Sequence, residues 1–179
     1  AWHEYFEPRN ALGHIGLPLL KAQNKYIFGP RVDQLNQDLL GRVATERPEL
    51  LFAYRGSHVY PNTLRMIRRV SPQTILIGYN NDDPFSPSYP KWKWRHFLAG
   101  VPEYDLVLAY RLHNLEEFKV AGARRVELLR SWFIPERNRP VDLDEEDRKR
   151  FGCDVVFVGH YEADERIEYL RSVVRAGHK

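Results

Sequence analysis

Short apolar runs alternate along the chain with segments whose apolar residues have helical spacing. The clearest runs are Leu50–Tyr54, Thr74–Gly78, Asp105–Ala109 and the shorter Val126–Leu129. Apolar runs of this length between turn residues are typical of buried strands, and runs without polar alternation are typical of parallel sheets covered by helices on both faces. The pattern therefore predicts an α/β protein with a Rossmann-like open parallel sheet flanked by helices.

The segments between these runs predict the connecting helices. The first helix is expected to follow Asp33, an N-cap residue, and the second to begin at Pro61, which suits a first turn. A third is expected over residues 91–100. A fourth is expected from Asn114, which can form a capping box with Glu117. The inward face of the third helix is expected to consist of Trp94, Phe97, Leu98 and Val101.

The composition changes in the last third of the chain. We predict an N-terminal domain over residues 1–134, a proline-rich and acidic linker over 135–152, and the beginning of a second domain over 153–179. That last segment pairs an apolar run, Asp154–Gly159, with a helical stripe of Ile167, Leu170 and Val174. One strand and one helix cannot form an independent core, so we expect them to be the first βα unit of a larger domain.

Composition and charge exclude several classes of protein. The 179 residues are 43% apolar, contain no apolar run of about 20 residues, and carry a formal net charge of +3. This small excess argues against nucleic-acid binding. A single cysteine, Cys153, and an N-terminus without signal-peptide features predict a reducing, cytoplasmic location. The basic and aromatic segment 91–97 leaves peripheral contact with anionic lipid at the inner membrane face open, through Trp92, Lys93 and Arg95.

Candidate chemistry lies where strands are expected to end, because ligands of open parallel sheets bind beyond the carboxyl ends of the strands. Four polar loops occupy such positions: Arg55–His58, Asn80–Ser86, Arg111–Asn114 and Gly159–Arg166. The second contains two amides and two carboxylates, which can orient hydroxyl groups, act as a general base or hold a hard cation. The same residue types also form ordinary turns.

Several familiar sites are missing from the sequence. Gly56 and Gly159 follow expected strands and permit close approach of a ligand, but neither begins a dinucleotide-binding or Walker glycine pattern. The cysteine and the histidines lack zinc-ligand spacing. His58, His113 and His160 lie on separate loops, and a lone histidine in such a place is more often a surface or capping residue than a catalyst.

Four segments together resemble one enzyme family. Ile75–Phe85, Tyr104–Val107, Asn114–Val126 and Asp154–Arg166 occur in the order found in the CgeB-type glycosyltransferases, which are spore-maturation-protein-like members of the two-Rossmann-domain GT-B class. The resemblance extends from about Leu50 onward. It implies a cytoplasmic enzyme of bacterial cell-surface or spore glycan synthesis that transfers a sugar from a nucleotide-sugar donor without a metal cofactor. In that class the N-terminal domain mostly binds the acceptor and the C-terminal domain the nucleotide.

The resemblance also implies roles for individual residues. Asn81, Asp82 and Asp83 would face the cleft from the acceptor side, with Asp82 or Asp83 as the catalytic base if the enzyme inverts configuration. The donor diphosphate would be approached by Gly159, His160 and Arg166. The carboxyl-end loops add further acceptor-side candidates, which are Arg55, Gly56, His58, Asn80 and Arg111.

The chain departs from the family pattern at both ends. The usual first strand with its glycine-bearing loop is not evident, and the second domain stops after one βα unit, so we expect residues 1–179 alone to show no transferase turnover and only weak donor binding. Two alternatives remain open, a receiver-like regulatory module and a sugar- or nucleotide-binding domain without catalysis. The acidic pair follows a middle strand rather than the first, which disfavours the receiver.

Overall fold

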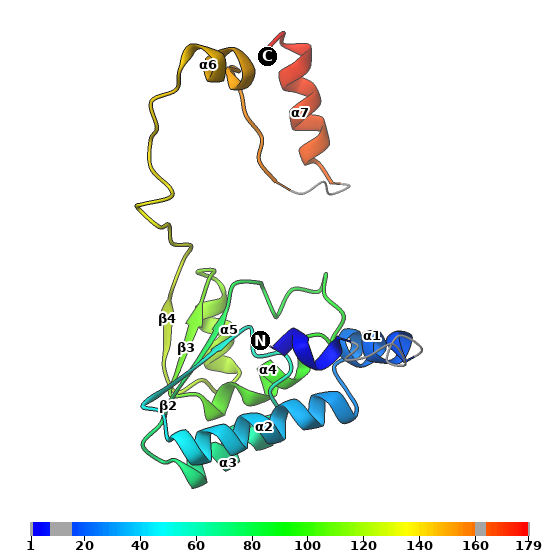
Figure 1. The fold of residues 1–179 in the computed structure, drawn as a ribbon, viewed down its shortest axis with the longest axis vertical. Coiled ribbons are helices and arrows are strands. Elements are labelled where there is room, and N and C mark those ends of the chain that lie inside the picture. The colour runs from blue at the N-terminus through cyan, green and yellow to red at the C-terminus, as the bar shows by residue number, and fades with distance from the viewer. Residues whose placement is uncertain (1, 8–15, 160–163, 179) are drawn as a thin grey trace. The chain divides into compact units, whose positions relative to one another are not determined.

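The computed structural model describes residues 2–7, 16–159 and 164–178. The chain divides into two compact units, residues 1–132 and 133–179, which are considered separately (Figure 1). The first unit contains η1 (Trp2–Phe6), α1 (Leu17–Tyr26), α2 (Pro30–Glu46), β1 (Leu50–Tyr54), α3 (Pro61–Val70), β2 (Ile75–Asn80), α4 (Arg95–Gly100), η3 (Val101–Glu103), β3 (Leu106–Ala109), α5 (Asn114–Val120) and β4 (Val126–Leu128). The second contains α6 (Glu145–Phe151) and α7 (Arg166–Arg175).

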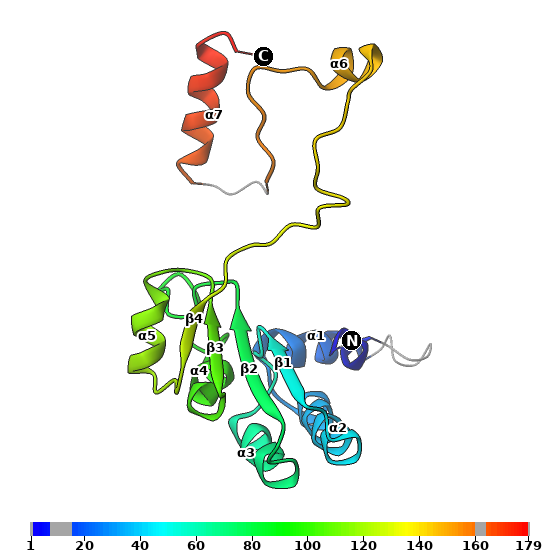
Figure 2. The same cartoon turned by 90° about the vertical axis from the view of Figure 1, so that its left-hand side faces the viewer.

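The first unit is built on a four-stranded, entirely parallel sheet in the order β1-β2-β3-β4 (Figure 2). Ala53 pairs with Gly78, and Gly78 in turn pairs with Val107. Strands of this kind need crossover connections, which α3, α4 and α5 provide. The predicted α/β class with an open parallel sheet is confirmed.

The helices that pack on the sheet lie on one of its faces. Alternate strand residues, among them Ala53, Leu76 and Val107, form one buried core with side chains from four helices, including Val43, Leu64, Phe97 and Phe118. The strand residues that alternate with these point to the opposite face of the sheet. Near one edge of the sheet four of them are exposed, namely Leu50, Phe52, Tyr54 and Ile75. Within the described residues, the expectation that helices cover both faces is therefore wrong.

Strand order explains this one-sided packing. Each strand of the sheet is the spatial neighbour of the strand before it in the chain. When successive crossovers join neighbouring parallel strands with the same hand, their helices lie on the same side of the sheet. Covering the second face requires a reversal of strand order, and the apolar runs of the sequence carry no information about that order.

Three helix starts differ from the sequence prediction. The N-cap of α5 is His113, so Asn114 is the first helical residue and forms no capping box. α2 begins at Pro30 rather than after Asp33, because Gly29, with φ +91°, takes the N-cap position and Pro30 fits the first turn. α4 begins only at Arg95, and residues 91–94 form turns in front of it. Trp94 is nevertheless buried at the N-cap of α4, as its place on the apolar stripe predicted.

The second unit differs more from its prediction. The acidic cluster expected in a linker begins α6, where Asp144 caps the helix by accepting a hydrogen bond of 2.8 Å from the Asp147 amide. Helix α7 forms where the apolar stripe predicted it. Residues 154–158, however, form no strand, and Val156 and Val158 are exposed. A strand needs a hydrogen-bonded neighbour, and no described residue pairs with this segment, so the expected βα unit is absent from the described structure.

Among the described residues, no helix has both the length and the apolar character that crossing a membrane requires.

Candidate functional site

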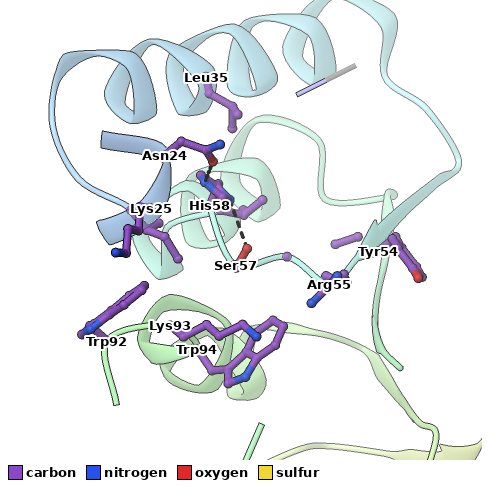
Figure 3. A pocket seen from close by; sticks show the side chains of 14 residues that line it. Asn24, Lys25, Leu35, Tyr54, Arg55, Ser57, His58, Trp92, Lys93 and Trp94 are labelled. Atoms are coloured by element: carbon purple, nitrogen blue, oxygen red, sulfur yellow. Dashed lines mark hydrogen bonds between the residues drawn. The ribbon is translucent and has the colours of Figure 1, made fainter. Parts of the chain in front are cut away.

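A pocket of about 480 Å³ opens at the carboxyl end of β1 (Figure 3). It lies between the loop that follows β1, the end of α1 and the turn that precedes α4. Its polar and aromatic lining consists of Asn24, Lys25, Tyr54, Arg55, Ser57, His58, Trp92, Lys93 and Trp94. The position agrees with the rule that ligands of parallel sheets bind beyond the carboxyl ends of the strands.

The loop after β1 has an unusual backbone. Arg55 and Gly56 both adopt positive φ, +64° and +54°. The Arg55 amide donates a hydrogen bond of 2.6 Å to the Tyr79 carbonyl, which continues the ladder to β2. Left-handed geometry at a non-glycine residue costs free energy, and such residues concentrate at functional sites. Gly56 is required for a second reason, because a Cβ there would lie 3.0 Å from the buried Tyr104 hydroxyl.

Asn36 of α2 holds the same loop in place. Its Nδ2 donates hydrogen bonds of 2.8 Å to the carbonyls of Val32 and His58. Its Oδ1 accepts bonds of 2.8 Å from the Tyr60 amide and the Thr63 hydroxyl. Asn36 is buried with its amide group fully used, so the loop that carries His58 is anchored to the domain core.

His58 is held as a neutral imidazole between two polar neighbours. Burial lowers its pKa from 6.5 to about 4, which outweighs the opposing hydrogen bond with Asn24. Its Nε2 lies 3.0 Å from Asn24 Oδ1, an acceptor, so Nε2 carries the hydrogen. Its Nδ1 then accepts from the Ser57 hydroxyl at 3.0 Å. The Ser57 oxygen remains available to accept a hydrogen bond from a ligand in the pocket.

Arg55 links the pocket to the loop after β2. Its guanidinium group pairs with the Asp82 carboxylate and lies 5.3 Å from the centroid of the Trp94 ring. The Asp82 amide is in turn fixed by Asn80 Oδ1 at 2.9 Å. Two of the four polar loops predicted from the sequence therefore meet through one ion pair.

Asp83 has a different environment from Asp82. Its Oδ1 accepts bonds from the Phe85 amide at 3.1 Å and from Asn114 Nδ2 at 2.9 Å, and its Oδ2 lies 2.9 Å from His113 Nε2. Burial raises the pKa of Asp83, but these hydrogen bonds outweigh burial and hold the pKa below its ordinary value. Asp83 is thus a weak base whose carboxylate joins the loops after β2 and β3.

Asp83 also belongs to a group that has the residue types of a metal site. Asp83, His113 and Glu117 each place one potential ligand atom within 4.8 Å of the others. Carboxylate and imidazole ligands of this kind suit zinc. Asn114 Nδ2 already bridges the two carboxylates, at 2.9 Å from Asp83 and 2.7 Å from Glu117, so hydrogen bonding alone accounts for the arrangement.

The other predicted acceptor-side residues do not line the pocket. Asn80 is fully buried; its Oδ1 supports Asp82, and its Nδ2 has no hydrogen-bond partner among the described residues. Asn81 is partly buried, and its Oδ1 likewise has no partner among the described residues. Arg111 is exposed on the loop after β3. Of the predicted set, the structure therefore brings Arg55, Gly56 and His58 together at the pocket.

The predicted donor-side residues belong to the second unit. Gly159 is exposed, and His160 lies outside the described residues. Arg166 is the first residue of α7, and its guanidinium pairs with the Asp164 carboxylate at 2.7 Å. The pKa of Asp164 is lowered chiefly by this hydrogen bond.

The three residues expected at a membrane surface have contacts within the first unit. Trp92 packs edge-on against Tyr26 with ring centroids 5.2 Å apart, and Lys93 lines the pocket. Arg95 donates hydrogen bonds to the carbonyls of Trp92, Tyr26 and Ile27. Contact with lipid stays a prediction that these packing contacts do not favour.

Sequence reasoning missed part of the pocket. Asn24 and Lys25 come from α1, about 30 residues before the loop they face, and nothing in their local pattern points to a site. The basic and aromatic character of Trp92 and Lys93 indicated a lipid surface instead of a pocket. The proline-rich segment before α4 was the signal that this stretch folds as turns.

No protein-family model, curated protein or solved structure matches the chain. The geometry of the pocket and the motif resemblance are therefore the grounds for a functional argument.

Proposed function

We propose that the chain is part of a cytoplasmic glycosyltransferase resembling the CgeB type, and that the pocket after β1 binds the acceptor. The observation that carries this proposal is the pocket itself, which combines aromatic rings with hydroxyl, amide and cationic groups at the carboxyl edge of a parallel sheet. The motif resemblance supplies the enzyme class.

The lining suits a sugar ring. Aromatic side chains provide large apolar faces with little loss of conformational freedom, and the partly exposed Trp92 supplies such a face in the pocket. Ser57 and Lys93 offer hydrogen-bonding groups that can orient hydroxyls. The volume of about 480 Å³ falls in the range of small-molecule sites and exceeds what one monosaccharide needs.

Asp82 is the better candidate for the catalytic base. Its carboxylate lies beside the pocket through its pair with Arg55, whereas the hydrogen bonds to Asp83 reduce the basicity of that residue. A base must lie within hydrogen-bond reach of the acceptor hydroxyl, and Asp82 is one side chain away from the lining. The resemblance assigns donor binding to the second unit through Gly159, His160 and Arg166, with no metal required.

Saturation-transfer NMR with neutral mono- and disaccharides tests acceptor binding. We expect transfer to the sugar ring protons, with loss of the signal in Trp92→Ala because this residue lines the pocket. Trp132→Ala is the matched control, since Trp132 is 64% exposed and contacts Tyr79 on the other face of the sheet. Absence of transfer from every sugar, or equal loss in both variants, would contradict the proposal.

A binding domain without catalysis is the second candidate. It is favoured by one observation, that both carboxylates of the loop after β2 are engaged by protein groups, Asp82 by Arg55 and Asp83 by His113 and Asn114. The two candidates differ in turnover. Release of nucleotide from a nucleotide-sugar in the presence of a bound sugar supports the enzyme, and sugar binding without any such release supports the binding domain.

A further inference from the structure

The pocket has an excess of positive charge. Lys25, Arg55 and Lys93 are among its described lining residues, and no aspartate or glutamate is. In Figure 3, Lys25 and Arg55 lie on opposite sides of the pocket, with Lys93 between them beside Trp94. Asp82, at the rim, compensates one of the three charges through its pair with Arg55. A neutral sugar gains little from two uncompensated cations.

Lys93 is held in the pocket wall by aromatic rings. Its Nζ lies 3.8 Å from the centroid of the Tyr89 ring and 4.9 Å from that of the Trp94 ring. Lys93 forms no ion pair with any residue that the structure describes. Burial lowers its pKa, and the nearby Arg55 lowers it further, against the opposing effect of Asp82. A partly buried ammonium group without a carboxylate partner gains free energy when an anion binds beside it.

Arg55 keeps hydrogen-bonding capacity after pairing with Asp82. The pair uses one terminal nitrogen of the guanidinium, and the side chain is 42% exposed. Its remaining N–H groups donate to no described residue. Guanidinium groups bind phosphate and carboxylate through two N–H groups at once, so Arg55 can hold Asp82 and an anion together.

We propose that the acceptor is an anionic sugar, and that Lys93 and Arg55 bind its phosphate or carboxylate group. This inference rests on the proposed function of the pocket as an acceptor site and adds the charge class of the sugar. The anion would lie between the Lys93 ammonium and the free side of the Arg55 guanidinium, and the sugar ring would pack on Trp92. Lys25, on the other side of the pocket, would add long-range attraction.

Isothermal titration of residues 1–179 with matched ligands tests the inference. The probes are glucose, glucose 6-phosphate, glucuronate and inorganic phosphate at low ionic strength. We expect at least one of the two anionic sugars to bind at least about tenfold more tightly than glucose, because a hydrogen bond between charged groups contributes that much to the affinity. The two anionic sugars show whether the group is a phosphate or a carboxylate.

Two substitutions identify the residue responsible. Lys93→Gln is expected to remove about tenfold of the affinity for the anionic sugar and a clearly smaller part of the affinity for glucose, because glutamine keeps an N–H donor for hydroxyl groups but loses the positive charge. Lys91→Gln is the control, because Lys91 is exposed and does not line the pocket. Equal effects of the two substitutions would overturn the inference.

The outcomes separate this inference from the proposed function. If glucose binds and neither anionic sugar binds more tightly, the inference that the acceptor is anionic is wrong, but the proposal that the pocket binds an acceptor sugar is unaffected. If inorganic phosphate binds as tightly as the sugar phosphate, the pocket holds an anion but the sugar contributes nothing, which contradicts the acceptor site. If none of the four probes binds, both proposals fail.

Discussion

The Arg55 guanidinium pairs with the Asp82 carboxylate and thereby joins the loops that follow β1 and β2. Arg55 also lies near the Trp94 ring, so the pair connects the candidate base at the pocket rim with the aromatic wall of the pocket. Asp83, the next residue, contacts the loop after β3 instead. Adjacent carboxylates therefore have separate roles, which substitutions can distinguish.

Asp82→Asn is predicted to lower the kcat of sugar transfer by about 10²-fold, because the amide keeps an acceptor oxygen for Arg55 but cannot take a proton. KM for the acceptor should change little. Asp82→Glu should restore part of the rate. A normal kcat in Asp82→Asn, measured with the active protein, would show that Asp82 only positions Arg55.

Asp83→Asn is predicted to act on stability instead of chemistry. Asparagine keeps one acceptor oxygen for the Phe85 amide and for Asn114, but it removes the negative charge and places an NH2 group where Oδ2 faces His113 Nε2, so we expect a loss of about 1–3 kcal/mol in the free energy of unfolding. Urea denaturation measures this quantity. A stable variant with a lowered kcat would instead assign the catalytic role to Asp83.

His58 is predicted to make the protein less stable as the pH falls from 6.5 to 4. Its pKa is about 4 in the folded state and near 6.5 in the unfolded chain, so over this interval only the unfolded chain binds the proton. A difference of this size corresponds to about 3 kcal/mol, lost progressively on acidification and complete below pH 4. Urea denaturation at several pH values should show the loss in the wild type and in His178→Gln, whose side chain is exposed, and a much smaller loss in His58→Gln.

Asn36→Ala is predicted to destabilise the first unit by about 2–4 kcal/mol, because the His58 carbonyl and the Tyr60 amide lose their partner in a buried position. Sugar binding should weaken as well, since Asn36 anchors the loop that carries Ser57 and His58. Thermal denaturation and the NMR titration measure the two effects. A variant with wild-type melting temperature would show that the loop holds its conformation without Asn36.

Gly78→Ala is predicted to destabilise the sheet by about 1–3 kcal/mol, because a Cβ at this position would lie 2.9 Å from the buried Tyr104 ring. Gly41→Ala is the matched control. Gly41 lies inside α2, and an alanine Cβ there would meet no atom within 4 Å, so this substitution should stabilise the helix by about 0.5–1 kcal/mol. If urea denaturation gave the same change in the free energy of unfolding for both variants, the close packing of Gly78 against the Tyr104 ring would be contradicted.

The α/β class of the fold could be predicted from the sequence, because local patterns of apolar residues and turn residues determine that class. Leu50–Tyr54 and the three apolar runs that follow it in the chain have the length of strands, and Pro61 marks the first turn of α3. One-sided packing depends on strand order, which is a long-range property. Residues 154–158 have the composition of a strand, but composition does not supply the neighbouring strand with which a strand must pair.

The candidate site could be predicted only in part for the same reason. Arg55, Gly56 and His58 were found because they follow a strand, and the sheet brings such loops to one edge. The separate environments of Asp82 and Asp83 depend on Arg55, His113 and Asn114, which come from other loops. Asn24 and Lys25 reach the pocket through the packing of α1, and no sequence spacing encodes that contact.

Backbone amide mapping by NMR tests the central claim most directly. Titration of ¹⁵N-labelled protein with the tightest-binding sugar should shift the amides of residues 55–59 and 92–94, which surround the pocket, and leave those of β4 at the far edge of the sheet unchanged. Shifts confined to residues outside the pocket, or no shifts at saturating sugar, would contradict an acceptor site at the carboxyl end of β1.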